Sequence, residues 1–279
     1  MTQQNNSIQI VIVLYKTALE DSKSFQSLKK HIGCLQTAYD LLIYNNSSEI
    51  FVPESKDYKL ITAPINMMLA HAYNCALQEG VKNNHKWLLL LDQDTVLTKD
   101  YFLSLNMQLN RSDVAGIFPV LKQGEKHLSP MSFSFILGTS GRPNTEKHEG
   151  LIENKFIVAC NSASVFSVEA LNSIGGFPEE FPLDALDVSV CHKLSKGKKK
   201  FYLLGTELQH DLSGLNYASV TEKRYRSIIE AELKMSKQAG AICFLATKIH
   251  LFLRVVKQCF IKERRPYATT TLRYLFRYK

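Results

Sequence analysis

Three features of the 279-residue sequence indicate an α/β fold with a mixed, mostly parallel central sheet flanked by helices. Short, β-branched apolar runs have the length of strands that are buried on both faces. Stretches with apolar residues three and four positions apart, typical of helices, alternate with these runs. Polar clusters follow where the runs end, at the edge where parallel sheets bind ligands. The composition, 45% hydrophobic and 22% charged, excludes a disordered, a collagen-like and a multi-span membrane protein.

The first part of the chain alternates strands and helices. The elements expected there are, in order, a strand over residues 8–15, a helix over 20–37, a strand over 40–44, a weak strand near 60–61, a helix over 66–81 and a strand over 86–91. The first and last of these strands are almost uninterrupted apolar runs, and Phe25, Leu28 and Ile32 give the first helix its period. The strand over 40–44 ends at Asn45-Asn-Ser-Ser, a turn-forming cluster. This order predicts βαβ units and a parallel sheet.

The second part of the body has weaker signals. The expected elements are strands over residues 114–121 and 156–168, separated by the polar loop 138–145, a helix from Ser167 to Gly175-Gly176, a helix over 185–194 and a strand over 200–204 that leads to His210. The paired glycines are typical of a helix end.

The C-terminal tail differs in charge from the body. Residues 215–279 carry a net charge of +10, whereas residues 1–214 carry −2. Residues 222–261 have a helical pattern, in which Thr247, His250, Arg254, Lys257 and Gln258 share an arc of about 100° opposite an apolar side. We therefore expect a catalytic domain over 1–214 and a basic, amphipathic C-terminal helical extension over 215–279 that meets an anionic membrane surface. The alternative is a helical hairpin that packs on the body or on a second subunit as a homodimer.

The cysteines indicate neither disulfides nor a zinc site. Six are scattered without a C-x-x-C pair, and the first residues contain no basic segment followed by an apolar core. We expect reduced thiols and a cytoplasmic protein without a signal peptide. The glycine-rich dinucleotide and P-loop motifs are both missing, so any nucleotide binds by another arrangement.

Asp92-Gln93-Asp94 follows the most apolar strand directly. Two carboxylates at a strand end form a hard oxygen site suited to Mg²⁺ or Mn²⁺, which would neutralise a diphosphate. The alternative is an acidic turn that precedes the helix at Lys99. Four leucines before the pair favour the metal site, because burying a strand against two carboxylates is costly without a reason.

A second acidic pair, Asp184 and Asp187, follows the paired glycines. One of the two carboxylates could act as a general base on a sugar hydroxyl. The alternative is an acidic first turn of the helix over residues 185–194, which the helix dipole favours. His210 by itself is more typical of a surface or core histidine than of a ligand.

Taken together, six segments resemble motifs of glycosyltransferase family 2, with its glycosyltransferase A fold, and within it the bacterial rhamnosyltransferase-like group. The resemblance covers residues 8–214. The six segments are Ile10–Tyr15, Asn45–Ser48 (family D-N-x-S), Asn66–Asn74 (N-x-G-x-A-x-A-x-N), Leu89–Thr95 (L-L-D-Q-D-S), Gly175–Asp187 (G-G-F-D-E-x-F-F-I-D-x-V-D) and His210–Gly214 (H-x-x-G). Their order along the chain matches that of the family.

The resemblance implies a role for each matched residue. Asp94, helped by Asp92, would bind the cation that holds the donor diphosphate, and His210 would approach that cation or diphosphate from the other side. Asp187 would be the base that activates the acceptor. The residues that would frame the nucleotide base and ribose are Tyr15, Asn45, Asn46 and Asn66.

The chain departs from the family pattern at several of these positions. Lys16 replaces an asparagine, Asn45 an aspartate, Met68 a glycine, and Lys193 the arginine of W-C-x-R. Lysine keeps the charge of arginine but lacks its bidentate fork. These departures bear most on the identity of the donor.

The function that the resemblance implies is a metal-dependent, inverting glycosyltransferase. It would move a sugar, with rhamnose suggested by the group, from a nucleotide diphosphate sugar to a saccharide acceptor, carried on a lipid, during bacterial surface polysaccharide synthesis. The enzyme would act as a peripheral protein on the inner face of the cell membrane. A catalytically impaired scaffold is the alternative. Nucleic-acid binding through the basic tail is disfavoured because the tail contains no recognised nucleic-acid motif.

Overall fold

The computed structural model describes residues 6–140, 149–152, 156–210 and 220–278. Contacts between residues divide the chain into two compact units. We call residues 1–132 with 141–211 the sheet unit, and residues 133–140 with 212–279 the helical unit. The two are described separately.

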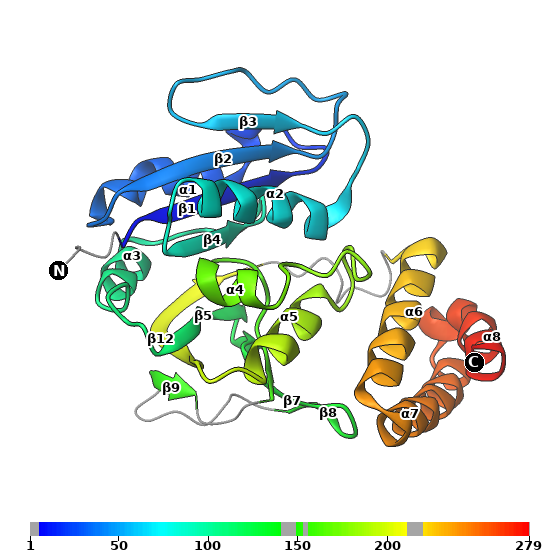
Figure 1. Cartoon of the computed structure of the whole chain (residues 1–279). Helices are drawn as coiled ribbons and strands as arrows, with labels where there is room; N and C mark the ends of the chain where they lie inside the picture. Colours follow the sequence, from blue (N-terminus) through cyan, green and yellow to red (C-terminus); the bar gives the residue numbers. More distant parts are fainter. Residues whose placement is uncertain (1–5, 141–148, 153–155, 211–219, 279) are drawn as a thin grey trace. The chain divides into compact units, whose positions relative to one another are not determined.

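A mixed nine-stranded sheet forms the centre of the sheet unit (Figure 1). Its strands pair in the order β3-β2-β1-β4-β11-β5-β12-β9, and β6 pairs with β5. The bounds are β1 Ile8–Leu14, β2 Tyr39–Asn45, β3 Lys59–Thr62, β4 Trp87–Leu91, β5 Val114–Gln123, β6 Lys126–Ser129, β9 Gly150–Ile152, β11 Ser164–Ser167 and β12 Lys200–Gln209. A separate short pairing joins β7 (Met131–Ser134) to β10 (Ile157–Val158).

The first four strands of the chain are parallel, as the sequence predicts. β1 pairs in parallel with β2 and β4, and β2 pairs in parallel with β3. β11 is antiparallel to both of its neighbours, β4 and β5, whereas β12 is parallel to β5. The carboxyl ends of β1, β2 and β4 therefore lie along one edge of the sheet.

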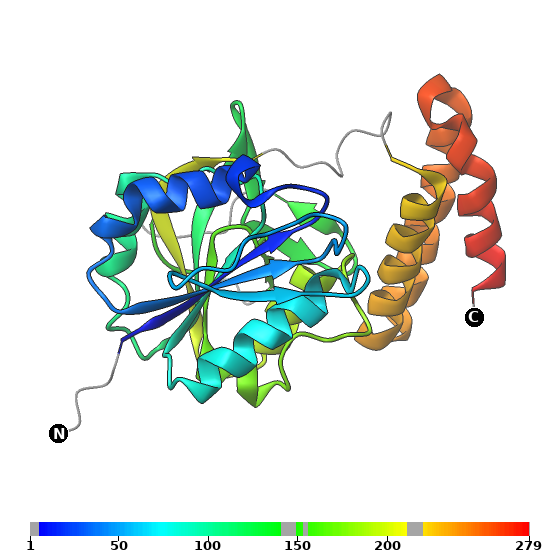
Figure 2. The same ribbon diagram turned by 90° about the horizontal axis from the view of Figure 1, so that it is seen from above.

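Helices cover both faces of this sheet. Figure 2 shows α1 (Lys23–His31) and α2 (Met68–Lys82) on opposite sides of the strands. The packing follows the period of two in the strands: in β1, Ile10 and Ile12 pack with α1 and α3 (Lys99–Asn106), whereas Val11 and Val13 pack with α2. α4 (Val168–Ser173) and α5 (Leu186–Ser195) lie on the same face as α2. The mixed, mostly parallel sheet flanked by helices confirms the predicted fold class.

Three elements expected in the sheet unit differ from those observed. The helix expected over residues 20–37 is shorter, because Ser22 caps α1 by accepting a hydrogen bond from the backbone of Phe25, and a 3-10 turn over Ile32–Cys34 ends it. The single strand expected over 156–168 is two strands, β10 and β11. Between them the backbone turns at Ala163, whose φ is 55°. The strand expected over 200–204 extends to Gln209.

The helical unit contains α6 (Glu222–Ala239), α7 (Ala241–Phe260), a 3-10 helix (Lys262–Tyr267) and α8 (Ala268–Arg277), together with β8 (Gly138–Ser140). The helical pattern expected over 222–261 is confirmed and is divided into two helices, because Gly240, with φ 121°, separates α6 from α7. The unit has a small core of its own, formed by Tyr225, Ile229, Leu233, Leu251 and Tyr267. Among the described helices, none combines the length and hydropathy that crossing a bilayer requires.

Candidate active site

The Asp92–Asp94 turn leaves the end of β4 and is fixed by Gln93. The side-chain oxygen of Gln93 accepts a hydrogen bond from the backbone N–H of Tyr15, 2.8 Å away, at the end of β1. Its backbone oxygen accepts one from the hydroxyl of Ser22, 3.0 Å away, at the start of α1. Both flanking aspartates are half-buried. The turn between the two carboxylates is therefore anchored to two neighbouring elements.

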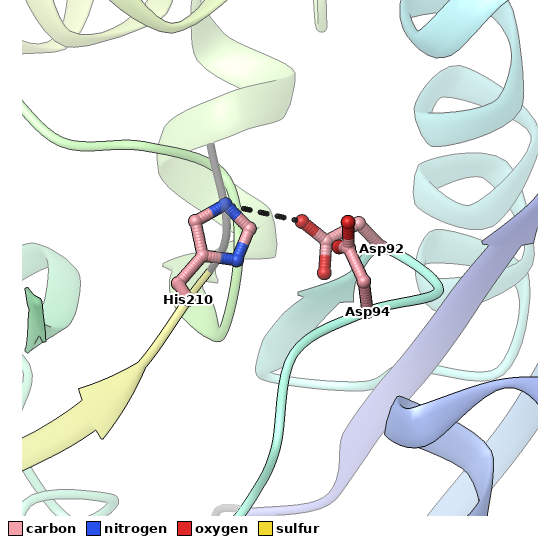
Figure 3. Close-up of side chains that lie close together, drawn as sticks. All are labelled: Asp92, Asp94 and His210. Carbon is pink, nitrogen blue, oxygen red and sulfur yellow. Dashed lines mark ion pairs between the residues drawn. The ribbon is translucent and has the colours of Figure 1, made fainter. Parts of the chain in front are cut away.

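Asp92, Asp94 and His210 form one cluster (Figure 3). His210 follows β12, is only 6% exposed, and its backbone N–H donates to the oxygen of Lys122 on β5. One ligand atom from each of the three side chains lies within 4.8 Å of the others. The predicted metal ligands, far apart in sequence, are thus brought together.

The donor set of this cluster fits a divalent cation. Two ligands that each bind such a cation at about 2.1 Å lie at most about 4.2 Å apart. Nε2 of His210 and Oδ2 of Asp92 are 3.7 Å apart, inside that limit, and the three ligand atoms, within 4.8 Å of one another, would need to close by only a few tenths of an ångström around an ion. Two carboxylates and one imidazole would leave further positions for phosphate or water oxygens.

Two hydroxyl groups orient the cluster. Thr95 donates a hydrogen bond to Oδ1 of Asp92, and Ser162 donates one to Oδ2. The same hydroxyls lie 3.4 Å from Nδ1 and 3.5 Å from Nε2 of His210. Thr95 is fully buried and Ser162 nearly so. Both carboxylate oxygens of Asp92 are thereby held in place before any ligand arrives.

Without a bound cation, the two carboxylates of the cluster repel each other. Burial, followed by the negative charge of Asp92, raises the pKa of Asp94 to about 6, whereas His210 lowers it. A carboxylate pair held together against its own repulsion is a favourable place for a positive ion.

Asp187 lies in the first turn of α5. The helix begins after Ala185, whose φ of 59° places it in the left-handed region. Burial raises the pKa of Asp187 to about 6, a hydrogen bond from the backbone N–H of Val188 lowers it, and the charge of Asp184 raises it again. The first-turn position given as the structural alternative is what Asp187 occupies. The raised pKa also suits a group that must take up a proton near neutral pH, so its role as a base stays a prediction.

The segment that leads to Asp187 is held by α2. The first backbone N–H groups of α2, those of Leu69 and Ala70, donate to the oxygen of Pro182 at 2.9 and 3.0 Å. Further along α2, the Asn74 amide both donates to and accepts from the backbone of Phe177, each at 2.8 Å. Two segments that resemble family motifs, around residues 66–74 and 175–187, are thus bonded to each other.

The pKa values of two side chains are raised both by the metal cluster and by Asp187. The buried phenol of Tyr73 on α2 has its pKa raised well above the ordinary value by burial, and then by the charges of Asp92, Asp187 and Asp94. Burial, followed by the charge of Asp187 and then of Asp92, likewise raises the pKa of the Cys160 thiol to about 12, against a lowering hydrogen bond with Ser129. Both groups therefore lie within electrostatic reach of the carboxylates.

The predicted nucleotide-binding asparagines are engaged within the protein. Asn45 is 1% exposed, donates to the oxygen of Ile50 and accepts from the backbone of Ser47, which closes the turn after β2. Asn46 accepts from the backbone of Met67 at 2.7 Å and donates to the oxygen of Met68. Both therefore shape the edge of the sheet, and their contact with a nucleotide stays a prediction.

Two further predicted contacts are more open to solvent. Tyr15 is 44% exposed at the end of β1. Asn66 is half-buried and accepts a hydrogen bond from the backbone of Met68 at 2.9 Å. Met68 itself has φ 65°, a conformation that favours glycine, and glycine is the residue that the family pattern has there. Of the expected His210–Gly214 motif, only His210 lies within the described residues.

The architecture is similar to those of solved glycosyltransferases. GalNAc-T7, solved with UDP, GalNAc and Mn²⁺, superposes with a TM-score of 0.58 at 10% identity, over 81% of this chain. The mannosyltransferase PcManGT from Pyrobaculum calidifontis, in complex with GDP-Man and Mn²⁺, superposes with a TM-score of 0.54 at 11% identity, over 96% of this chain and 84% of its own. S. aureus TarS 1–349 gives 0.52 at 9% identity, over 96% and 91%. The chain has the glycosyltransferase A fold.

These similarities are of structure. The chain spans 47% of the length of GalNAc-T7 and 39% of that of a longer TarS structure. The sequence matches no family model and none of the curated proteins compared with it. The rhamnosyltransferase-like group is therefore not distinguished from other proteins with the glycosyltransferase A fold.

Sequence reasoning missed four side chains of this site, namely Tyr73, Thr95, Cys160 and Ser162. Thr95 directly follows the two aspartates and could have been included on that ground. Ser162 had no signal, because it reaches Asp92 only through the turn between β10 and β11, which the sequence predicts as one strand.

Proposed function

We propose that this chain is a metal-dependent, inverting glycosyltransferase of family 2. The observation that carries the proposal is the cluster of Asp92, Asp94 and His210, whose ligand atoms lie within 4.8 Å of one another. Asp187 supports it, because burial and then the charges of Asp92, Asp187 and Asp94 all raise the pKa of the Tyr73 phenol. A metal-binding pair and a separate raised-pKa carboxylate within one neighbourhood are what transfer of a sugar from a diphosphate to a hydroxyl requires.

The leaving group is handled at the Asp92–Asp94–His210 cluster. Mn²⁺ or Mg²⁺ bound there would stabilise the negative charge that develops on the departing nucleoside diphosphate. Thr95 and Ser162 hold Asp92 through hydrogen bonds, so its oxygens need not reorganise when the donor binds. The mannosyltransferase PcManGT, with GDP-Man and Mn²⁺, supports this assignment by analogy.

Asp187 acts on the acceptor. Its carboxylate accepts the proton of the acceptor hydroxyl while the hydroxyl oxygen attacks the anomeric carbon, and the bond from that carbon to the diphosphate oxygen breaks, leaving its electron pair on the diphosphate. One displacement inverts the configuration at the anomeric carbon. The Cys160 thiol is an unsuitable nucleophile for a two-step alternative, because its pKa of about 12 keeps it protonated at neutral pH.

Substrates and location follow from the family resemblance. We assign catalysis to residues 1–214, with Tyr15, Asn45, Asn46 and Asn66 near the nucleotide and rhamnose as the sugar of first choice. The acceptor is a saccharide carried on a lipid diphosphate during surface polysaccharide synthesis, at the inner face of the cell membrane. GDP-Man and UDP-GlcNAc in solved structures of similar fold support a nucleotide sugar as donor.

Donor binding and hydrolysis test this proposal. A panel of nucleoside diphosphates and nucleotide sugars, each with and without Mn²⁺, is screened by thermal shift, since a ligand that binds the folded state raises the melting temperature. Asp94→Asn is expected to lose the Mn²⁺-dependent shift. Asp187→Asn is expected to keep the shift and lose turnover. Asp57→Asn, which changes an exposed aspartate in the loop before β3, is the matched control.

Either of two results would contradict the proposal. One is a wild-type protein that no nucleotide or nucleotide sugar stabilises in the presence of Mn²⁺. The other is equal donor hydrolysis by the wild type and Asp94→Asn, which would favour a scaffold without catalytic function.

A further inference from the structure

Helix α7 exposes a continuous apolar stripe. Seven side chains along its length are between 42% and 80% exposed: Ile242, Leu245, Ile249, Phe252, Leu253, Val256 and Phe260. At 100° per residue they fall within an arc of about 100° on the helix surface. An apolar surface of this length on a folded unit usually marks an interaction site.

The inward side of α7 places Leu251 in the core of the unit and, beside it, polar side chains that bond to α6 and α8. Gln258 is 1% exposed, donates to the hydroxyl of Tyr225 on α6 at 2.6 Å, and accepts from the hydroxyl of Thr271 on α8 at 2.8 Å. Arg254 pairs with Glu232 of α6 at 2.9 Å. These polar contacts, together with the burial of Leu251 in the core, turn α7 so that the stripe faces outward.

Lys248 adds to this orientation. Its ammonium group donates to the backbone oxygens of Tyr274, Leu275 and Tyr278, between 2.6 and 3.1 Å away, at the end of α8. The charge of Lys248 is therefore used within the unit. The stripe itself contains no charged side chain.

The charge of this part of the chain is complementary to an anionic surface. Residues 215–279 contain 14 lysines and arginines against four glutamates. Three of those glutamates are engaged inside the unit: Glu222 with Arg226, Glu232 with Arg254, and Glu230 with the hydroxyl of Tyr274. The surplus is positive, so two copies would repel each other whereas an anionic surface would attract either one.

A basic cavity lies beside the stripe. It has a volume of about 310 Å³ and is lined by His250, Leu253, Arg254, Lys257, Gln258 and Arg264. Leu253 belongs to both the stripe and the cavity wall. Arginine and lysine together bind phosphate by charge-assisted hydrogen bonds, so an anionic phosphate group fits this place.

We propose that the helical unit docks on an anionic lipid bilayer, with the α7 stripe inserted among the acyl chains and a lipid phosphate in the basic cavity. Apolar insertion and attraction of basic side chains to anionic headgroups are the two contributions that hold interfacial helices on membranes. Docking does not depend on the proposed transferase activity, because none of these residues belongs to the candidate active site.

Vesicle binding by the full chain tests the docking. Co-sedimentation is measured with vesicles of phosphatidylcholine alone and with about 30% phosphatidylglycerol. The double variant Phe252→Glu/Phe260→Glu changes two well-exposed side chains, and it is expected to bind the mixed vesicles about tenfold or more weakly. The variant Lys257→Gln/Arg264→Gln is expected to lose the preference for phosphatidylglycerol. Lys56→Gln/Lys126→Gln, which removes the same charge from exposed positions of the sheet unit, is the matched control.

A second readout reports insertion directly. Phe252→Trp is expected to be quenched by brominated acyl chains, whereas Phe51→Trp, at an 83% exposed position of the sheet unit, is not. Absence of wild-type binding to the mixed vesicles would overturn membrane docking. So would unchanged binding by the double glutamate variant, an unquenched Trp at position 252, or a lipid-free dimer that the glutamates dissociate without any vesicle binding by the wild type.

Discussion

Replacing Asp187 by asparagine is expected to stabilise the folded sheet unit. Asparagine has nearly the same shape and keeps an oxygen to accept the hydrogen bond from the backbone of Val188. It removes a carboxylate whose pKa burial raises from 3.8 to about 6. The variant therefore trades the proposed base for a neutral group that suits the same surroundings.

The size of the effect follows from the pKa. Because the folded-state pKa is raised, the folded protein retains a proton that the unfolded chain releases between pH 3.8 and about 6, so stability falls as pH rises through that window. For these values the penalty is about 2 kcal/mol at pH 5 and about 3 kcal/mol at pH 7.5, where it has levelled off. Asp187→Asn is expected to recover these amounts, because asparagine does not titrate.

The single tryptophan makes the measurement specific. Trp87 is the only tryptophan of the chain and lies buried in β4, so its fluorescence reports unfolding of the sheet unit. Urea titrations of wild type, Asp187→Asn and the control Asp57→Asn are compared at pH 5 and pH 7.5 without cation. A destabilised Asp187→Asn, or a gain that is the same at both pH values, would refute the reasoning that burial penalises this charge.

Two other substitutions and one pH profile are expected to give measurable effects. Met68→Gly should raise stability by about 1 kcal/mol, since Met68 is held at φ 65°, where a side chain is strained. Gly176→Ala should lower stability by about 1–3 kcal/mol, because its φ is 78° and a Cβ would lie 2.7 Å from Oδ1 of Asn74. The rate of sugar transfer, kcat/KM, should fall at least about tenfold per pH unit below pH 6, because Asp187, with a pKa of about 6, becomes protonated, and protonation of Asp94 would steepen the fall.

Each of these three predictions has its own measurement or control. For Met68→Gly the urea midpoint of Trp87 fluorescence must rise, and an unchanged or lower midpoint would contradict the strain. Gly175→Ala shares the positive φ of its neighbour, at 80°, but has open space around the added Cβ, so it should lose less stability than Gly176→Ala. A kcat/KM that stays level from pH 7 to pH 5 would exclude Asp187 as the group that takes the proton.

The sequence predicts the parallel half of the fold well because its signals there are local. The apolar runs of β1 and β4 and the clusters that follow them are sufficient to place Asp92 and Asp94 at the edge of a sheet. The antiparallel insertion of β11 is a long-range pairing. The turn before it, at Ala163, is left-handed without a glycine or proline to indicate it. Ser162 and Cys160 lie in this turn region, so that part of the site could not be foreseen.

The candidate site illustrates the same distinction. The resemblance to family motifs selects Asp187 and His210, although neither has a local signal that separates a site residue from a structural one. The asparagines show the converse: their motifs are recognisable, yet Asn45, Asn46 and Asn74 bond to the backbone of their own chain. A motif can therefore mark residues that build the edge of a binding site as well as residues that contact the ligand.

The hydrogen bonds of Gln258 fix the rotation of α7 about its own axis. Apolar contacts are non-directional, so a helix packed by them alone could turn and bury its more hydrophobic side. Hydrogen bonds to Tyr225 and Thr271 allow one angular setting, and any other would leave buried polar groups unsatisfied. Replacing Gln258 by leucine and Thr271 by valine would remove these hydrogen bonds, and α7 could then rotate so that the apolar stripe becomes buried. Polar contacts beside Leu251 in the interior thus help to keep the stripe of this helix on the outside.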